Sequence, residues 1–383
     1  MTWFNLRRIT TSGKFIPQID GLRFIAIVSV MLFHLHASLA HNGAIRSPFA
    51  DQALLMDTLS KRGVQLFFVI SGFILALPFA SARLKGGPEV GLKSYFVRRL
   101  TRLEPPYIIA LLFCAMIWLV ARHEDIRGLL PHLLASMSYV HNIVYLAPST
   151  INGVAWSLEV EIQFYLLVPL LTLVFLIKKP STRRLLLGIT IALAGIASSF
   201  LAQTPLQLSL LYYGNFFLAG FLFCDLYVSR SPSWERASFS WDGAALLLWP
   251  LVWLSPESIA HVLLPFLMVI LFVTVFRGRA GKAVFSLPLI TTVGGMCYSI
   301  YLLHFVLISS VGKITKSLRL GTNFGVYFAL QCAIVLPIVV AACAVFFIAI
   351  ERPCMDRRWP SKLWHFLSIR RFRAAERAAV QTN

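Results

Sequence analysis

Long apolar stretches recur along the whole chain, and they restrict its fold more than any other feature of the sequence. A run of about 20 apolar residues is long enough to cross the hydrocarbon core of a membrane as a helix. Hydrophobic residues make up 58% of the 383 residues and charged residues only 13%, a balance typical of polytopic membrane proteins. We therefore predict an all-α transmembrane helix bundle of about ten spans, at 22–42, 63–80, 105–121, 154–177, 185–201, 206–228, 243–255, 259–276, 288–311 and 325–350.

The basic residues fall unevenly on the segments that connect these spans. With the N-terminus in the cytoplasm, most of the 35 Lys and Arg residues lie on the cytoplasmic side, which favours an N-in and C-in topology. The segment 129–146 is also apolar, but as a span it would place Lys178, Lys179, Arg183 and Arg184 outside, against this distribution. We predict a re-entrant or interfacial piece there, on the outer side.

Several other classes of protein are disfavoured. The six cysteines are scattered without a Cys-x-x-Cys motif, and His34 and His36 point in nearly opposite directions on a helix, so neither a disulfide framework nor a metal site is predicted. The net charge of +19 lies mainly in loops beside the spans, which favours anionic lipid and a phosphorylated cytoplasmic ligand over nucleic acid. We predict a membrane domain over 1–356 and a basic amphipathic cytoplasmic tail over 357–383.

The first span carries two polar side chains on one face. Arg23 lies near its start and His34 lies eleven residues later, about 20° away around the helix and roughly 16 Å further along it. Ionisable groups inside a membrane span usually face a protein interior or a wet cavity. The simpler alternatives are an Arg23 that reaches the lipid headgroups and a His34 that only packs in the core.

Two further spans place polar groups near the predicted depth of His34. Ser71 and Glu161 are both expected about a third of the way in from the outer surface. Glu161 is the sharpest anomaly, because a buried carboxylate needs a partner, and His34 is a candidate. Glu159 lies about 200° away on the same helix, so only Glu161 is expected to join His34. For Ser71, close helix packing together with Gly72 is the structural alternative.

A cluster of arginines precedes the third span. Arg98, Arg99 and Arg102 lie in the most basic inner loop, and Arg99 and Arg102 share a helical face at the cytoplasmic mouth. Forked guanidinium groups suit contact with phosphate, although ordinary positive-inside charge is the alternative. The ninth span places His304 one turn after Tyr301, and a core histidine with a hydroxyl partner is the simpler interpretation of that pair.

The motifs form one ordered set from residue 20 to about 353. They are Asp20-Gly21-Leu22-Arg23 with His34, Phe68 with Ser71-Gly72-Phe73, Arg98-Arg99-x-x-Arg102 before Pro105-Pro106-Tyr107, Trp156-Ser157-Leu158 with Glu161-x-x-Phe164-Tyr165, and Tyr298-Ser299-x-Tyr301-Leu302-x-His304. Each motif alone is weak, but together they resemble acyltransferase family 3, the bacterial integral-membrane acyltransferases that modify surface and exported glycans. Glu104 departs from the family pattern, and no hydrolase-like domain is expected after the tenth span.

The resemblance implies an O-acyltransferase of the bacterial inner (cytoplasmic) membrane. The donor substrate would be acetyl-CoA or another acyl-CoA from the cytoplasm, with no permanently bound cofactor. The acceptor would be a hydroxyl of a surface or exported carbohydrate, free or lipid-linked, such as exopolysaccharide, O-antigen or lipo-oligosaccharide. Contacts with other polysaccharide-assembly proteins fit this function. The particular glycan, hydroxyl and acyl chain stay open.

Roles follow for the residues that match the motifs. His34 would be the general base on the acceptor hydroxyl, a role worth about 10²–10⁴-fold, and Glu161 would orient its imidazole. Ser71, Tyr301 or an arginine could stabilise the oxyanion, and transient acylation of His34 is a further open choice. Donor binding is expected from Arg23, Arg98, Arg99 and Arg102. Supporting roles are expected for Trp156, Tyr165, Tyr301 and His304.

Two functions of other classes compete with this hypothesis. A non-enzymatic transporter or flippase of a polar lipid or glycan would also need His, Arg and Glu inside the membrane. The sequence shows no paired repeat and no matching Gly- or Pro-broken spans in two halves, which disfavours this class. A structural subunit of a polysaccharide assembly complex would leave three polar groups at one depth unexplained.

Overall fold

The prediction of an all-helical polytopic bundle is confirmed. The structure is a computed structural model that describes residues 6, 8–9, 15–41, 50–121, 123–231, 234, 236–256, 260–318, 320, 323–356, 359 and 361. Over these residues it contains helices and connecting segments without any strand, apart from one isolated bridge between Ser238 and Gly278. Eight described helices are long and apolar enough to cross a membrane, and two shorter apolar helices, Phe239–Leu254 and Leu263–Arg277, lie where the seventh and eighth spans are predicted. The N-in and C-in topology stays a prediction.

The helices follow one another in the predicted order. The long ones are α1 (Pro17–His41), α2 (Ala50–Lys85), α3 (Leu92–Ala121), α6 (Trp156–Leu171), α7 (Pro180–Leu201), α8 (Leu210–Val228), α14 (Cys297–Thr315) and α15 (Phe324–Phe346). The shorter ones are α4 (Ile126–Met137), α5 (His141–Val144), η1 (Thr172–Leu176), η2 (Pro205–Leu208), α9 (Phe239–Leu254), α11 (Leu263–Arg277), α12 (Arg279–Val284), α13 (Pro288–Gly295), the π-helical η4 (Phe347–Glu351) and α16 (Arg352–Cys354).

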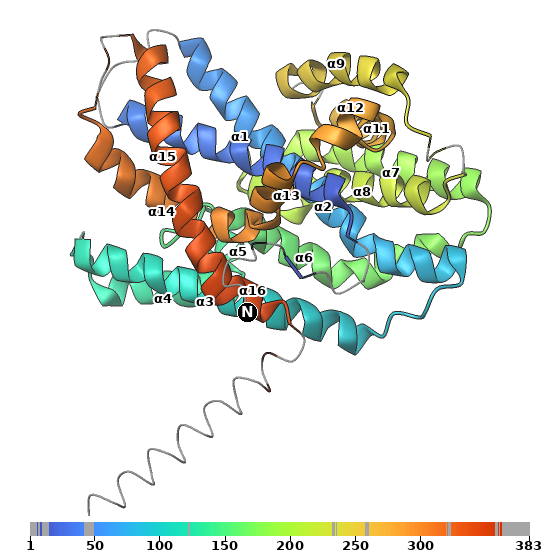
Figure 1. Cartoon of the computed structure of the whole chain (residues 1–383). Coiled ribbons are helices and arrows are strands. Elements are labelled where there is room, and N and C mark those ends of the chain that lie inside the picture. The colour runs from blue at the N-terminus through green and yellow to red at the C-terminus, as the bar shows by residue number, and fades with distance from the viewer. Residues whose placement is uncertain are drawn as a thin grey trace, which may run out of the picture.

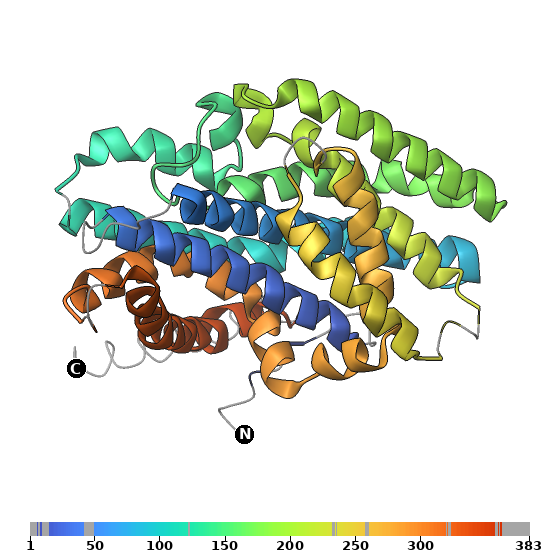
Figure 2. The ribbon, with the colours of Figure 1, turned by 90° about the horizontal axis from the view of Figure 1, so that it is seen from above.

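Helix α2 lies at the centre of the bundle. It packs along α8 on one side and along α1 on the other, while α7 packs against α8 and α9 against α11 (Figures 1 and 2). Helix α1 also contacts α13, α14 and α15, although these helices lie at the far end of the sequence (Figure 1). The polar residues of α1 therefore face partners from both ends of the chain.

Glycines let α2 and α8 approach closely. A Cβ atom at Gly72 would overlap the carbonyl oxygen of Phe217, and one at Gly220 would overlap the carbonyl oxygen of Val69. Small residues that allow backbones to meet are a common basis of helix packing in membranes. The packing alternative for Ser71 and Gly72 thus holds for Gly72, and its neighbour Ser71 points to a different partner, as described below.

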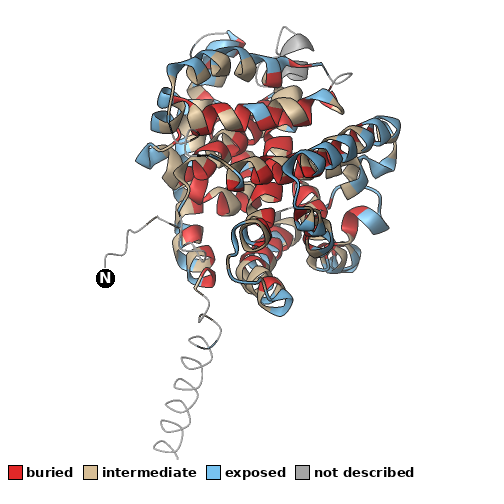
Figure 3. Cartoon of the chain, turned by 90° about the vertical axis from the view of Figure 1, so that its right-hand side faces the viewer, coloured by how far each residue is buried: buried red, intermediate tan, exposed pale blue. Residues whose placement is uncertain are grey.

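The outer faces of the bundle are apolar. Large apolar side chains such as Leu185, Phe200, Leu246 and Val345 are more than half exposed, while buried residues gather along the middle of the molecule (Figure 3). In water such a surface would be unfavourable, but lipid tails are as apolar as these side chains. The distribution fits a bundle that contacts lipid around its sides.

Three predicted segments need comment. The segment 129–146 forms only α4 and α5, both too short to span, so the prediction that it is not a full span is confirmed. The predicted continuous span 288–311 is wrong, because the helix breaks at Met296 between α13 and α14, directly after Gly294 and Gly295, which are weak helix formers. The predicted tail 357–383 lies outside the described residues except for Trp359 and Ser361.

Candidate active site

Ser71 and Glu161 lie together between α2 and α6. The Ser71 hydroxyl donates to Oε1 of Glu161 at 2.5 Å, and the Tyr165 hydroxyl donates to the same oxygen at 2.5 Å. Tyr165 follows Glu161 by one helical turn, so its side chain reaches back over Glu161. The expectation that Ser71 and Glu161 meet is therefore confirmed in geometry. Their catalytic roles stay predictions.

Arg99 extends this group of residues. Its guanidinium carbon lies 5.6 Å from the centre of the Tyr165 ring and 5.9 Å from the centre of the Tyr95 ring. We call Ser71, Glu161, Tyr165 and Arg99 the carboxylate cluster. The sequence predicted Arg99 at the inner mouth of the bundle and Glu161 in its outer half. One tyrosine side chain contacts both residues, so they lie closer together than these predicted depths imply. Those depth estimates assumed straight, upright helices, and the packing does not follow them.

A second buried carboxylate accompanies Arg102. Glu351, in η4, accepts hydrogen bonds from the backbone N–H of Ser299 at 3.0 Å and from its hydroxyl at 2.5 Å. Arg102 is an electrostatic neighbour of this carboxylate. Arg98 lies on the same helix, half-buried. Glu351 is a residue that the sequence analysis did not single out, although a carboxylate beside an apolar span was a usable signal.

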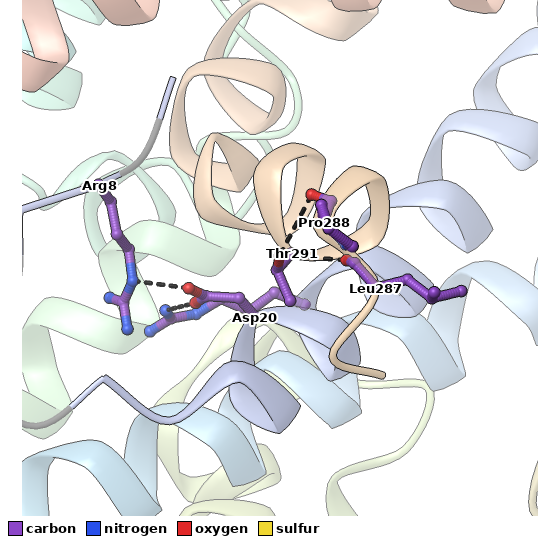
Figure 4. A network of polar contacts seen from close by, with 6 residues as sticks. Arg8, Asp20, Leu287, Pro288 and Thr291 are labelled. Carbon is purple, nitrogen blue, oxygen red and sulfur yellow. Dashed lines mark hydrogen bonds and ion pairs between the residues drawn. The ribbon is translucent and has the colours of Figure 1, made fainter. Parts of the chain in front are cut away.

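Arg23 forms part of an ion network at the start of α1. Its Nη1 donates to Oδ1 of Asp20 at 2.7 Å, and Nε of Arg8 donates to Oδ2 of the same carboxylate at 2.8 Å (Figure 4). We call these three residues the Asp20 network. Burial, together with the positive charge of Arg23, lowers the pKa of Arg8 to about 10, although Asp20 acts in the opposite direction. Arg23 is thus held inside the protein, and Arg8 is a participant that the sequence had not singled out.

His34 lies against α14. Its imidazole centre is 5.1 Å from that of His304 and 5.2 Å from the ring of Phe305. Among the described residues no hydrogen bond joins His34 to Glu161, so the expected pairing of these two side chains is wrong in this structure. Instead, Oε1 of Glu161 accepts hydrogen bonds from Ser71 and Tyr165, and α1 packs against α14, which places His34 beside His304. We call His34 and His304 the histidine pair.

The hydrogen bonds of His304 define its tautomer. Nδ1 lies 2.9 Å from the carbonyl oxygens of both Ile300 and Tyr301, and a carbonyl oxygen only accepts, so Nδ1 carries the proton. Nε2 is consequently the unprotonated nitrogen. It is buried and has no hydrogen-bond partner among the described residues. An unsatisfied buried acceptor is rare in proteins, and here it belongs to the ring beside His34.

Tyr301 connects two helices. Its hydroxyl donates to the carbonyl oxygen of Val154 and accepts from the Ser157 hydroxyl at 3.1 Å and the Leu158 backbone N–H at 3.2 Å. These contacts hold α14 against the start of α6. Nearby, the half-buried ring of Trp156 packs against Tyr213 at 5.4 Å between ring centres.

Glu159 serves a different part of the protein from Glu161. It is fully buried, and its Oε2 accepts the backbone N–H of Asn142 in α5 at 2.8 Å. The two glutamates therefore face different partners, as their helical spacing predicts. Within the described ranges, no group of three His, Cys, Asp or Glu side chains is arranged to hold a metal ion.

The comparisons with known proteins agree with these motifs. Part of the chain, 53% of its length, is 30% identical over 220 residues to a peptidoglycan O-acetyltransferase of Listeria monocytogenes. Another part, 43% of the chain, is 32% identical over 181 residues to a Staphylococcus aureus protein named as an O-acetyltransferase. The matches cover 32% and 26% of those relatives, so the chain spans only about a third of their length or less.

No solved structure matches the chain significantly. The family model described as an acyltransferase domain, by contrast, matches residues 16–350, which include every motif from Asp20 to His304. The chain belongs to acyltransferase family 3.

Proposed function

We propose that the protein is a membrane O-acyltransferase that transfers an acyl group, with acetyl favoured, from acyl-CoA to a hydroxyl of an exported carbohydrate. Membership of the family supports the reaction class. The names of the relatives make peptidoglycan the first acceptor to test, before surface polysaccharides. The protein would act in the cytoplasmic membrane, alone or with other polysaccharide-assembly proteins. The observation that carries the mechanism is the histidine pair.

The reaction needs one proton to be moved. The acceptor oxygen forms a bond to the thioester carbonyl carbon, and the bond from that carbon to sulfur breaks. In the proposal His34 takes the proton from the acceptor hydroxyl and returns it to the leaving thiolate of coenzyme A, as a general acid and base. A path through an acyl group on His34 uses the same residue as nucleophile.

His304 is proposed to position His34. Its Nδ1 proton is held by two backbone carbonyls, so Nε2 can only accept a hydrogen bond. An N–H of His34 turned toward this acceptor would leave the other His34 nitrogen unprotonated for the substrate. This gives His304 the orienting role that the sequence had assigned to Glu161.

The geometry narrows the choice of oxyanion donor. The Tyr301 hydroxyl gives its proton to Val154, and the Ser71 hydroxyl gives its proton to Glu161. The sequence left Ser71, Tyr301 or an arginine as the oxyanion donor. We infer that an arginine, rather than either hydroxyl, would donate hydrogen bonds to the oxyanion.

The arginines are also proposed to bind the donor. The guanidinium of Arg99 lies beside the rings of Tyr95 and Tyr165, and its N–H groups would bind the phosphates of coenzyme A. Arg102 lies near enough to Glu351 to be held in place electrostatically. Both side chains come from α3, one turn apart.

A transfer assay with purified protein tests the proposal. The full chain in lipid nanodiscs would be given radiolabelled acetyl-CoA and peptidoglycan fragments or surface polysaccharide, and label on glycan and free coenzyme A would be measured. We expect transfer to at least one glycan. A protein that releases no coenzyme A with any of these acceptors would match the transporter class instead.

A further inference from the structure

A pocket lies away from the candidate active site, between the start of α1 and the ends of α8 and α11. Its volume is about 340 Å³. Its polar lining consists of Gln18, Tyr227, Arg230, Trp234 and Lys282. Gln18 precedes Asp20 by two residues, and so points to roughly the opposite side of α1 from the Asp20 network. The pocket is therefore distinct from the residues proposed for catalysis and donor binding.

Cations and aromatic rings alternate around this pocket. The Arg230 guanidinium lies 4.0 Å from the centre of the Tyr227 ring. Arg277, at the end of α11, lies between the rings of Trp234 and Trp241, at 5.5 Å and 4.8 Å. Lys282 adds a further positive charge, and the described lining residues include no Asp or Glu. The nearest carboxylate on α9, Asp242, is already bound to the first three backbone N–H groups of α12.

One hydrogen-bond donor in the lining of the pocket, and a second on the residue next to it in space, lack acceptors. The indole Nε1 of Trp234 and the Nε of Arg277 are both buried without a partner among the described residues. Such donors destabilise a protein unless an acceptor reaches them. Trp234 lines the pocket, and the Arg277 guanidinium carbon lies 5.5 Å from the centre of its ring, so a ligand rich in acceptors that binds beside Trp234 would lie close to both donors.

We propose that this pocket binds a phosphate group. Phosphate oxygens accept hydrogen bonds from several directions, which suits the guanidinium of Arg230 and the indole of Trp234, both in the segment after α8, and the ammonium of Lys282 in α12. The apolar part of the lining, Phe15, Ile16, Pro17 and Phe276, would contact the organic part of the ligand. The phosphate could belong to an anionic phospholipid headgroup or to a soluble phosphorylated molecule, and the experiment below separates these sources.

The test measures binding to the purified full chain in detergent, without acyl donor or acceptor. The lipid probes are dioctanoyl phosphatidylglycerol and, as neutral comparison, dioctanoyl phosphatidylcholine. The soluble probe is inorganic pyrophosphate. We expect at least one anionic probe to bind more tightly than the neutral lipid, and the double variant Arg230→Gln with Lys282→Gln to bind it about tenfold more weakly. Binding of phosphatidylglycerol alone identifies a headgroup site, and binding of pyrophosphate alone identifies a site for a soluble ligand.

Two further variants make the result specific. Trp234→Phe keeps an aromatic ring but removes the indole N–H with the rest of the pyrrole ring, so it should weaken binding severalfold while the protein stays folded. Lys85→Gln with Lys93→Gln removes two exposed charges elsewhere and should change binding less than twofold. Equal binding of neutral and anionic lipid, or equal losses in the pocket and control variants, would overturn the proposal. Because no transfer is measured, failure here is distinguishable from failure of the proposed enzyme.

Discussion

The carboxylate cluster and the histidine pair lie in the same bundle but differ in how their hydrogen bonds are made. In the carboxylate cluster, Ser71 and Tyr165 both donate to one oxygen of Glu161, and the Arg99 guanidinium lies over the ring of the tyrosine. In the histidine pair, His304 has one nitrogen held by two carbonyls and the other buried without a partner, and His34 makes only ring contacts with described residues.

This difference in hydrogen bonding indicates different tasks for the two groups of residues. In the carboxylate cluster both hydroxyl donors have an acceptor, which holds these side chains in place and suits a structural or ligand-positioning task. A buried nitrogen that lacks a partner costs stability and calls for an explanation. His36 and His304 both have such a nitrogen, but only the ring of His304 lies against that of His34, whereas His36 packs among phenylalanines. We therefore expect chemistry at the histidine pair and positioning at the carboxylate cluster.

The largest effect should come from His34→Ala. It should lower acetyl transfer by about 10²–10⁴-fold, the range for loss of a general base, while acyl-CoA still binds. Arg99→Ala with Arg102→Ala should show the reverse, with weaker acyl-CoA binding, more so at low salt where charges are less screened. Calorimetric titration with coenzyme A and the transfer assay measure the two quantities separately.

His36→Gln is the matched control for His34. His36 lies on the same helix but packs against Phe324 and Phe328, so its replacement should leave transfer close to wild type. If His34→Ala lost donor binding while the arginine variant kept it, the assignment of chemistry and binding to different residues would be wrong.

Glu161→Gln should have the next largest effect, about 10–10²-fold, the range for a partner that positions other groups. The amide still accepts hydrogen bonds from Ser71 and Tyr165 but loses the charge beside Arg23 and Arg99. Glu159→Gln should stay near wild type, since its amide oxygen can still accept the N–H of Asn142. The transfer assay on both variants checks this, and similar losses in the two would contradict a special role for Glu161.

The role of His304 can be tested by replacing it with Asn or with Gln, because each amide group reproduces one of the two imidazole nitrogens. Asn places its amide near Nδ1 and keeps the donor to the backbone, whereas Gln places its amide nearer Nε2 and keeps an acceptor toward His34. If His304 positions His34, His304→Gln should retain about tenfold more activity than His304→Asn, within the range for such indirect partners. The pH profile of transfer should also shift in the Asn variant, while a purely structural role would leave it unchanged.

Tyr301→Phe should have the smallest effect on chemistry. It removes contacts with Val154, Ser157 and Leu158 and should lower stability by about 1–3 kcal/mol, because buried polar groups lose their partner. Thermal unfolding in detergent measures this loss. Transfer per folded molecule should remain within a fewfold of wild type. A large drop in transfer at full stability would return Tyr301 to the list of oxyanion donors.

Local sequence determined the elements and much of the site. Apolar length indicated the spans, helical spacing placed Arg99 and Arg102 on one turn and separated Glu159 from Glu161, and the ordered motifs indicated the family. These properties depend on residues within a few turns of each other, where helix geometry fixes direction and rise. The failures were local too: the break at Met296 follows two glycines whose effect inside an apolar run was underestimated.

Tertiary packing alone decided which polar side chains meet. By its predicted depth, Glu161 could have paired with His34. In the structure, α2 packs so that Ser71 donates to Glu161, and α14 packs on α1 so that His304 lies beside His34. The position of a residue along its helix follows from the sequence, whereas the tilt, rotation and neighbours of the helix follow from close contacts such as those at Gly72 and Gly220. Those contacts join residues far apart in the chain, so no local pattern encodes them.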